Sequence, residues 1–121
     1  MLDVSERGYG DAISSWRGRG YGPGRGLLVE SENFYGGAAH GGLGNYHVGI
    51  NGVYDSVSDP VLPGSSGTLK EYSGHNEYAR AGGGAIRIDA TGVVTLNGAL
   101  AANGRASGER VGAGSGGSVL V

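Results

Sequence analysis

The sequence predicts an all-β chain, a short glycine-rich parallel β-helix, and three observations point to this class. Glycine supplies 28 of the 121 residues, about three times the roughly 7% of an ordinary protein. Short apolar segments alternate with polar residues at a period of two, the side-chain period of a β-strand. A glycine-rich run that leads into a short strand occurs twice, at 82–88 and 114–121. Because no window keeps a helical period, we expect almost no helix.

Each expected strand is a short alternating segment bounded by glycine, proline or Asn-Gly. The first segment shows the pattern, since Leu2 and Val4 alternate with polar residues before Gly8 ends the run. In chain order, the expected strands are 2–5, 26–30, 46–50, 85–90, 93–97, 99–102 and 118–121.

Turn signals separate these strands. Asn51-Gly52, Asn97-Gly98 and Asn103-Gly104 supply residues that tolerate a positive φ. Two prolines in SDPVLPGSSG, at 58–67, predict an irregular loop, and the polar stretch 64–84 predicts an excursion from the strands.

The internal repeat fixes how two strands should stack. Laying Gly84 on Gly117, an offset of 33, aligns the two glycine-rich runs and the strands that follow them. By the period of two, Arg87 and Asp89 face outward from the first copy. Val94 and Leu96 continue the inward pattern after a Thr-Gly turn. The side chains expected to line one shared narrow interior are Ile86, Ile88, Val119 and Val121.

A parallel β-helix accounts for these features, because glycine serves at sharp corners and where coils approach closely. Two alternatives stay open. An antiparallel meander or sandwich would place hairpins at the Asn-Gly pairs. A largely disordered chain would fit the high glycine content, although the net charge of only −2 argues against it.

Several glycine-rich motifs carry a resemblance to a known class of proteins. They are GYGPGRG (20–26), GGAAHGGLG (36–44), GGGAIRI (82–88) and GSGGSVLV (114–121). In this order they resemble the glycine-rich β-helical repeat regions of very large bacterial surface or secreted proteins, the pectin-lyase-like, adhesin-type solenoids. The resemblance covers residues 2–121 and implies a right-handed parallel β-helix in an extracellular or envelope protein. It carries over no catalytic residue.

The expected organisation is one segment, 1–121, of a longer repeat protein. Residues 1–15 lack the basic start and apolar run of a signal peptide, so an extracellular or cell-envelope location would need a signal outside this chain. No apolar run approaches the about 20 residues that span a membrane. Open edges at 2–5 and 118–121 predict association with neighbouring coils or identical chains, a homo-oligomer.

The titratable residues predict no cofactor and no metal site. His40, His47 and His75 share no metal-ligand spacing, and the chain has no cysteine. We expect His40, within AAHGG, to be a loop histidine that hydrogen-bonds to the backbone. The sequence leaves ligand-binding residues unknown.

Carboxylates that could act as an acid–base pair occur at three places, namely Asp55/Asp59, Glu71/Glu77 and Asp89 beside Arg87. We expect Asp55 and Asp59 to cap turns, and Asp89 and Arg87 to form a weak surface ion pair. Because only one acidic strand position is well patterned, no catalytic residue is assigned and no enzyme activity is expected.

The chain is therefore expected to be a structural or adhesive module that binds polysaccharide or another surface protein, with specificity in loops 32–44, 55–81 and 104–117. A fragment of a polysaccharide-degrading β-helix enzyme is the first alternative. A Gly-Arg-rich nucleic-acid-binding segment is the second, because SWRGRGYGPGRG (15–26) combines arginines with aromatic residues. The sequence pI of about 5.8 disfavours nucleic acid as a partner.

Overall fold

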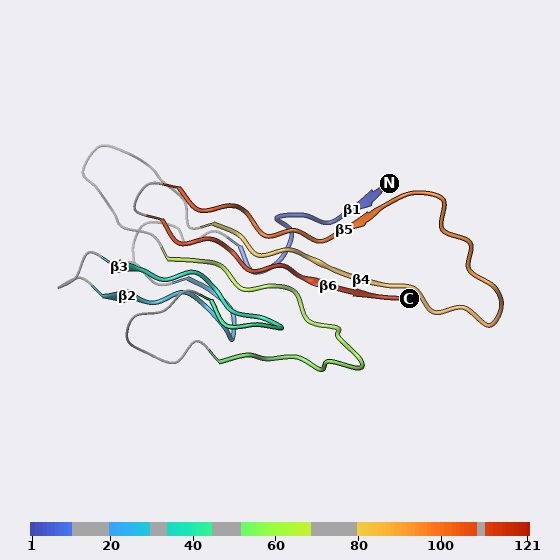
Figure 1. Ribbon diagram of the computed structural model, residues 1–121, viewed down its shortest axis with the longest axis horizontal. Helices are drawn as coiled ribbons and strands as arrows, with labels where there is room; N and C mark the ends of the chain where they lie inside the picture. Colours follow the sequence, from blue (N-terminus) through green and yellow to red (C-terminus); the bar gives the residue numbers. More distant parts are fainter. Residues whose placement is uncertain (11–19, 30–33, 45–51, 69–79, 109–110) are drawn as a thin grey trace.

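The computed structural model describes residues 1–10, 20–29, 34–44, 52–68, 80–108 and 111–121. Extended chains run side by side along the long axis, and the described residues contain short strands and no helix (Figure 1). This confirms the expectation of a sheet-containing chain without helix. The strands are β1 (Leu2–Asp3), β2 (Leu28–Val29), β3 (Phe34–Tyr35), β4 (Ala85–Arg87), β5 (Leu100–Ala101) and β6 (Ser118–Leu120). No helix that could cross a membrane is found in the described part of the chain.

In the described ranges the strands form three separate two-stranded sheets. β1 pairs with β5 and β4 pairs with β6, both in parallel, whereas β2 and β3 are antiparallel. In the β4–β6 pair, Ile86 lies opposite Val119. The repeat offset of 33 residues read from the sequence is therefore the register of this pair.

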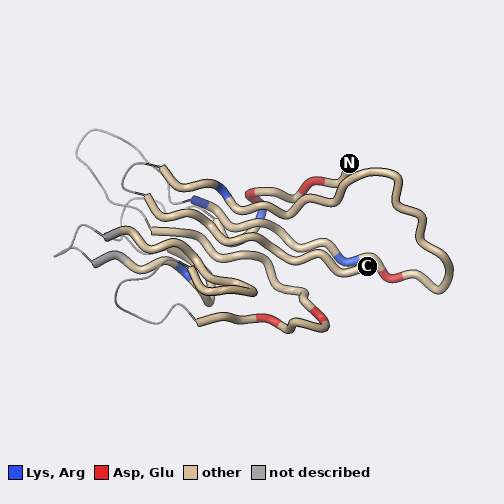
Figure 2. The backbone as a smooth tube through the Cα atoms, viewed as in Figure 1, with Lys and Arg blue, Asp and Glu red and all other residues tan. Residues whose placement is uncertain are grey.

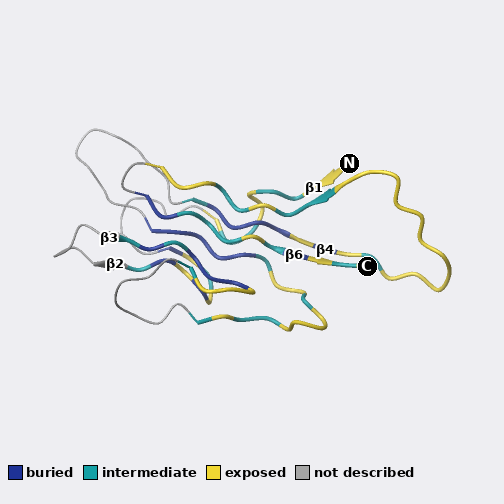
Figure 3. Ribbon diagram, viewed as in Figure 1, coloured by how far each residue is buried: buried dark blue, intermediate teal, exposed yellow. Residues whose placement is uncertain are grey.

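A chain segment outside all six strands lies at the centre of the molecule. Residues 64–68 are all buried, and Figure 3 shows them among the buried middle chains. A β-strand hydrogen-bonds to a neighbour on each of two sides, but this segment bonds to more. Its backbone hydrogen bonds reach five other segments, at Tyr9, Tyr21, Gly36, Gly83 and Gly112.

Extended chains with three residues per turn, as in polyproline II, point successive backbone groups in different directions and can bond to several neighbours. The central region is thus a bundle of extended chains cross-linked by backbone hydrogen bonds. Of the predicted irregular loop at 58–67, residues 58–62 do form a largely exposed loop, whereas 64–67 are buried in the bundle. Residues 69–79 of the predicted excursion at 64–84 lie outside the described residues, and the prediction is wrong at the buried residues 64–68 and 81–84. The sequence there looked polar and loop-like, but its serines and glycines are buried against neighbouring backbone.

Glycine allows these chains to approach closely. A Cβ atom on Gly117 would overlap the carbonyl oxygen of Gly84, and one on Gly83 would overlap that of Ala102. The glycine hydrogen in this direction can instead form a weak Cα–H···O contact. Among the described glycines only Gly22 has a positive φ, of 97°. The expected role in close approach is confirmed, whereas the expected role at positive-φ corners applies to one described glycine.

The buried interior is small and largely polar. Ser65, Ser66 and Thr68 are fully buried, and their hydroxyls bond to neighbouring backbone. For example, Thr68 Oγ1 donates to the carbonyl oxygen of Gly36 at 3.0 Å. Backbone and hydroxyl groups therefore fill the centre. The buried apolar side chains in the described residues are Ala38, Ala39, Ala81, Ile86 and Val111.

The expected shared interior of four branched side chains is not present. Ile86 is only 5% exposed, but Val119 is 40% and Val121 is 59% exposed. The register was predicted correctly while the burial was not. The β4–β6 pair is a separate two-stranded sheet, and no third described strand pairs with it to continue the stack. Arg87 faces solvent, as expected.

The expected strand 93–97 is wrong, because residues 89–98 form an exposed loop that projects beyond both termini (Figure 1). Val93, Val94 and Leu96 are all exposed. Within the described residues, no other segment donates a backbone hydrogen bond to this loop or accepts one from it. An alternating pattern does not form a strand without a partner edge.

Other expected strands are confirmed in part. Those at 2–5, 26–30, 85–90, 99–102 and 118–121 contain β1, β2, β4, β5 and β6, whereas β3 was not predicted. The expected strand 46–50 lies outside the described residues. Asn103-Gly104 forms no hairpin, since the backbone N–H of Glu6 donates to the Asn103 carbonyl as the two chains continue in parallel.

Candidate functional site

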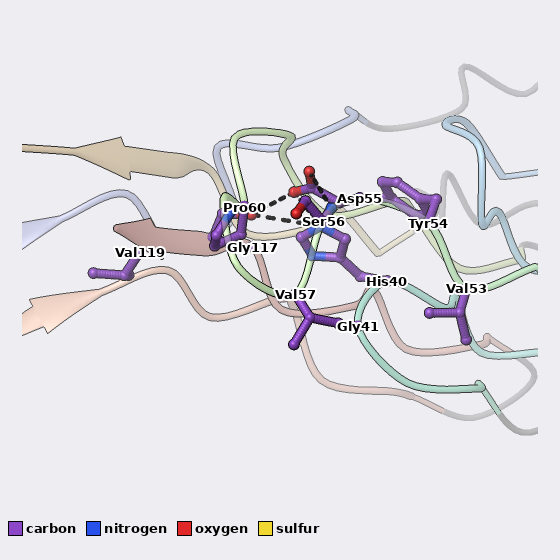
Figure 4. A pocket seen from close by; sticks show the side chains of 11 residues that line it. His40, Gly41, Val53, Tyr54, Asp55, Ser56, Val57, Pro60, Gly117 and Val119 are labelled. Atoms are coloured by element: carbon purple, nitrogen blue, oxygen red, sulfur yellow. Dashed lines mark hydrogen bonds and ion pairs between the residues drawn. The ribbon is translucent and has the colours of Figure 1, made fainter. Parts of the chain in front are cut away.

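An open pocket of about 260 Å³ lies where three segments meet beside the start of β6. Figure 4 shows His40 and Asp55 together in this pocket, with valine side chains around them. The lining residues come from 40–41, 53–60 and 117–119. Exposed Val53, Val57 and Val119 make the walls apolar. Three polar residues of the lining form one connected cluster with buried side chains, namely His40, Asp55 and Ser118.

Asp55 organises the loop that follows it. Its backbone φ is 75°, a left-handed conformation that aspartate adopts more readily than most residues. The side chain is only 6% exposed. Its carboxylate accepts hydrogen bonds from the backbone N–H groups of Ser56, Val61 and Leu62, at 2.9, 3.0 and 2.8 Å. The expectation that Asp55 caps a turn is confirmed, and the turn is the whole loop 55–62.

This environment keeps Asp55 ionised. Burial alone would raise its pKa, but the backbone hydrogen bonds from Leu62, Ser56 and Val61 outweigh burial, and His40 adds to them. Together they hold the pKa of the Asp55 carboxyl far below its ordinary value of 3.8. The loop is therefore wrapped around a carboxylate anion.

His40 connects this loop to the glycine bundle. Its Nδ1 lies 2.8 Å from the carbonyl oxygen of Gly116, and its Nε2 lies 3.2 Å from Asp55 Oδ2. The Tyr54 ring packs against the imidazole, with ring centroids 4.6 Å apart. The Tyr54 backbone N–H donates to the His40 carbonyl at 3.0 Å. The expectation that His40 hydrogen-bonds to backbone is confirmed, whereas its contact with Asp55 was not predicted.

Ser118, the first residue of β6, completes the cluster. Its Oγ lies 2.6 Å from the Leu62 carbonyl oxygen, 3.0 Å from Asp55 Oδ2 and 3.5 Å from His40 Nε2. The shortest contact joins β6 to the end of loop 55–62. The Ser118 hydroxyl thus contacts His40, Asp55 and the end of loop 55–62.

Serine, histidine and aspartate in contact invite comparison with a nucleophilic triad. In a triad, aspartate accepts from Nδ1–H, and Nε2 accepts the serine proton. Here the Gly116 carbonyl occupies Nδ1, and Asp55 and Ser118 both face Nε2. The single Ser118 proton is closest to the Leu62 carbonyl oxygen. This geometry does not prepare Ser118 for attack, and the cluster acts chemically as a set of ties between segments.

The remaining expected site residues lie elsewhere. Arg87 contacts Asp89 at 2.8 Å and Asp59 at 3.4 Å, and all three side chains are at least half exposed. The expected Arg87–Asp89 surface ion pair is confirmed, and solvent keeps such pairs weak. Asp59 does not join Asp55 in the cluster but pairs with Arg87 outside it. His47, His75, Glu71 and Glu77 lie outside the described residues.

The cluster could not be assembled from sequence spacing. His40 lies 15 residues before Asp55 and 78 before Ser118, and no motif links positions so far apart. The one usable signal was a histidine between small residues, where the imidazole can reach a carbonyl. In the described part of the chain, no group of three or more His, Cys, Asp or Glu residues could hold a metal ion.

Comparison with known proteins gives no match. The chain matches no protein-family model, no curated protein and no solved structure.

Proposed function

We propose that the chain is a structural or adhesive module of a surface or secreted protein, without catalytic activity of its own. In this role the bundle is a stiff scaffold, and the loops at its end make contacts. The observation that supports this most is the central segment 64–68, which is buried and hydrogen-bonded to five other segments. Bending such a bundle would break bonds in several directions at once.

The loops at one end suit docking. Loop 89–98 is exposed over its whole length, and loop 55–62 carries Val57 with its side chain fully in solvent. Exposed apolar groups close together often mark interaction sites. Polysaccharide or another surface protein is the partner that this proposal assigns to them.

The parallel β1–β5 and β4–β6 pairs support a finer form of the proposal. Parallel strands are normally covered on both faces, yet Leu2, Val119 and Val121 are exposed. The pairing of β4 with β6 at the repeat offset favours coils of a parallel β-helix at this end. Neighbouring coils or identical chains would then cover the exposed residues.

Within the described residues, charge gives little support to the nucleic-acid alternative, and residues 15–19 of its Gly-Arg segment lie outside them. Figure 2 shows acidic and basic residues interspersed along the described backbone. Arg87 pairs with two aspartates, and Arg105 lies 3.7 Å from Glu6. A nucleic-acid surface would instead gather unpaired basic groups on one face.

The proposal is tested with the complete chain in two measurements. Hydrogen exchange should be slowest, and similar in rate, at Gly64, Gly67, Gly83 and Gly112, since these amides cross-link the bundle. Fast exchange at these four amides would contradict the proposed stiff scaffold.

The second measurement separates adhesion from catalysis. The labelled chain is incubated with cellulose, chitin and polygalacturonate, and both retention and soluble reducing ends are followed. We expect retention on at least one polymer without product. Release of reducing ends would favour the polysaccharide-degrading alternative, and absence of any retention would limit the role to a structural one.

A further inference from the structure

The surroundings of His40 match only one protonation state. Nδ1 faces the Gly116 carbonyl oxygen at 2.8 Å, and Nε2 faces the Asp55 carboxylate at 3.2 Å. Both partners are acceptors, and neither has a proton to donate. A neutral imidazole carries one N–H, whereas the imidazolium carries two. The two contacts are satisfied together only when both ring nitrogens are protonated.

Among the described residues, Asp55 is the one charged group that contacts His40. Loop 55–62 contributes Asp55, and the preceding Tyr54 contributes its ring. Tyr54 donates its hydroxyl proton to the Pro63 carbonyl, and burial raises its pKa, so it stays neutral. β6 contributes the Ser118 hydroxyl, and the bundle contributes the Gly116 carbonyl. Nearby Asp59 is paired with Arg87 in solvent.

We propose that His40 and Asp55 form a proton-operated clasp, which holds loop 55–62 against residues 116–118 while His40 is doubly protonated and releases it when that proton is lost. The clasp concerns the loop itself and stands independently of the adhesive role proposed above. Because residues of the loop and Val119 both line the pocket, the clasp also sets how open the pocket is.

Loss of the second proton to water turns an attraction into a repulsion. One ring nitrogen would then present a lone pair to an acceptor, either the Asp55 carboxylate oxygen at 3.2 Å or the Gly116 carbonyl oxygen at 2.8 Å, and in either case the link through His40 between the loop and Gly116 is broken. Ser118 could turn its proton toward Nε2, but only by giving up the Leu62 carbonyl at 2.6 Å. Since the amides of Ser56, Val61 and Leu62 all bond to Asp55, movement of this side chain would release the loop as one unit.

The direction of the pH response follows from linkage. The closed clasp needs the charged form of the imidazole, because both ring nitrogens face acceptors. Histidine loses this charge as pH rises through the range from about 5 to 8. On the acid side, the lowered pKa of Asp55 keeps its carboxylate available below the ordinary value of 3.8. The clasp is therefore closed in mildly acidic solution and opens toward alkaline pH.

Hydrogen exchange of the Val61 and Leu62 amides reads the clasp directly, with the bundle amide of Gly83 as internal reference. Between about pH 5 and pH 8, the range in which histidine changes charge, we expect their protection relative to Gly83 to fall about tenfold, as for loss of a charge-assisted bond. The ¹⁵N signals of the His40 ring should change from two protonated nitrogens to one over the same range.

Two substitutions separate the two contacts of His40. A glutamine amide can reach Asp55 and donates at every pH, so His40→Gln should keep the loop protected without a pH response. Asparagine places its amide where Nδ1 lies and cannot reach Asp55, so His40→Asn should leave the loop unprotected throughout. A variant with His47 and His75 both changed to Gln keeps His40 and should respond as the parent chain does.

Three results would overturn the clasp. They are flat protection of the loop across the pH range in the parent chain, a pH response that persists in His40→Gln, and a His40 ring with one protonated nitrogen throughout. The ¹⁵N measurement and the His47/His75 variant both keep His40 and Asp55 unchanged. They therefore test the clasp even if a His40 variant fails to fold.

Discussion

Residues 64–68 and 81–84 are buried without exception, whereas every residue of loop 89–98 is exposed. The buried segments consist of small residues, GSSGT at 64–68 and AGGG at 81–84, and carry no large aliphatic side chain. The exposed loop carries Val93, Val94 and Leu96. Hydropathy alone would place the two regions the other way round. Burial in this molecule follows how closely two backbones can approach, and that depends on glycine and on hydroxyls that replace water.

The sharpest test of this comparison uses two adjacent glycines. A Cβ on Gly117 would overlap the Gly84 carbonyl, whereas a Cβ on Gly116 would lie 3.8 Å from its nearest neighbour, the Ala102 carbonyl. We expect Gly117→Ala to lower the free energy of unfolding by about 3 kcal/mol, because backbone cannot move aside easily. Gly116→Ala should change it by less than about 0.5 kcal/mol. Urea unfolding measures both, and equal effects would contradict the close-approach argument.

A buried and an exposed threonine test the role of hydroxyls. Thr68→Val removes the hydroxyl that donates to the Gly36 carbonyl while keeping the side-chain shape. We expect a loss of about 1 kcal/mol in the free energy of unfolding. Thr91→Val, in the exposed loop, is the matched control and should be neutral. Thermal unfolding measures both variants. If Thr68→Val left the free energy of unfolding unchanged, the buried hydroxyl would not be needed for stability.

Acid should affect loop 55–62 more than loop 89–98. The pKa of Asp55 is lowered because hydrogen bonds from Leu62, Ser56 and Val61 outweigh burial, so its stabilising contribution is present above the ordinary value of 3.8 and is lost as pH falls below it. Asp55→Asn should remove this part of the acid response. Asp89→Asn should change it less, since Asp89 pairs with Arg87 in solvent. The measurement is the denaturation midpoint of each variant down to about pH 2. The same acid response in both variants would contradict the larger role of Asp55.

The smallest effect on stability is expected in the exposed loop. Changing Val93 and Val94 to Thr and Leu96 to Gln should alter the free energy of unfolding by less than about 0.5 kcal/mol. Association should fall, because the loop presents apolar groups that identical chains or a partner would cover. Sedimentation at high concentration measures it. A large loss of stability would show that the loop is part of the core.

The comparison also explains which parts of the candidate site could be predicted. Arg87 and Asp89 are two residues apart, and their pair was predicted. For His40 the sequence predicted a hydrogen bond to backbone, but not its partner, the Gly116 carbonyl, which is 76 residues away. The contacts of His40 with Asp55 and Ser118 join residues far apart in sequence. Nothing in the sequence near any one of them specifies the other two.

Three features could be predicted without the structure: extended chain without helix in the described residues, short strands, and a β4–β6 register equal to the repeat offset. These follow from local conformational preferences and side-chain period, which neighbouring residues set. Three others depend on contacts between distant segments: the central position of 64–68, the exposure of Val93 and Val94, and the meeting of His40 with Asp55 and Ser118. Each of these depends on where a distant carbonyl or carboxylate lies, and a serine or glycine carries no record of that position in its own neighbourhood.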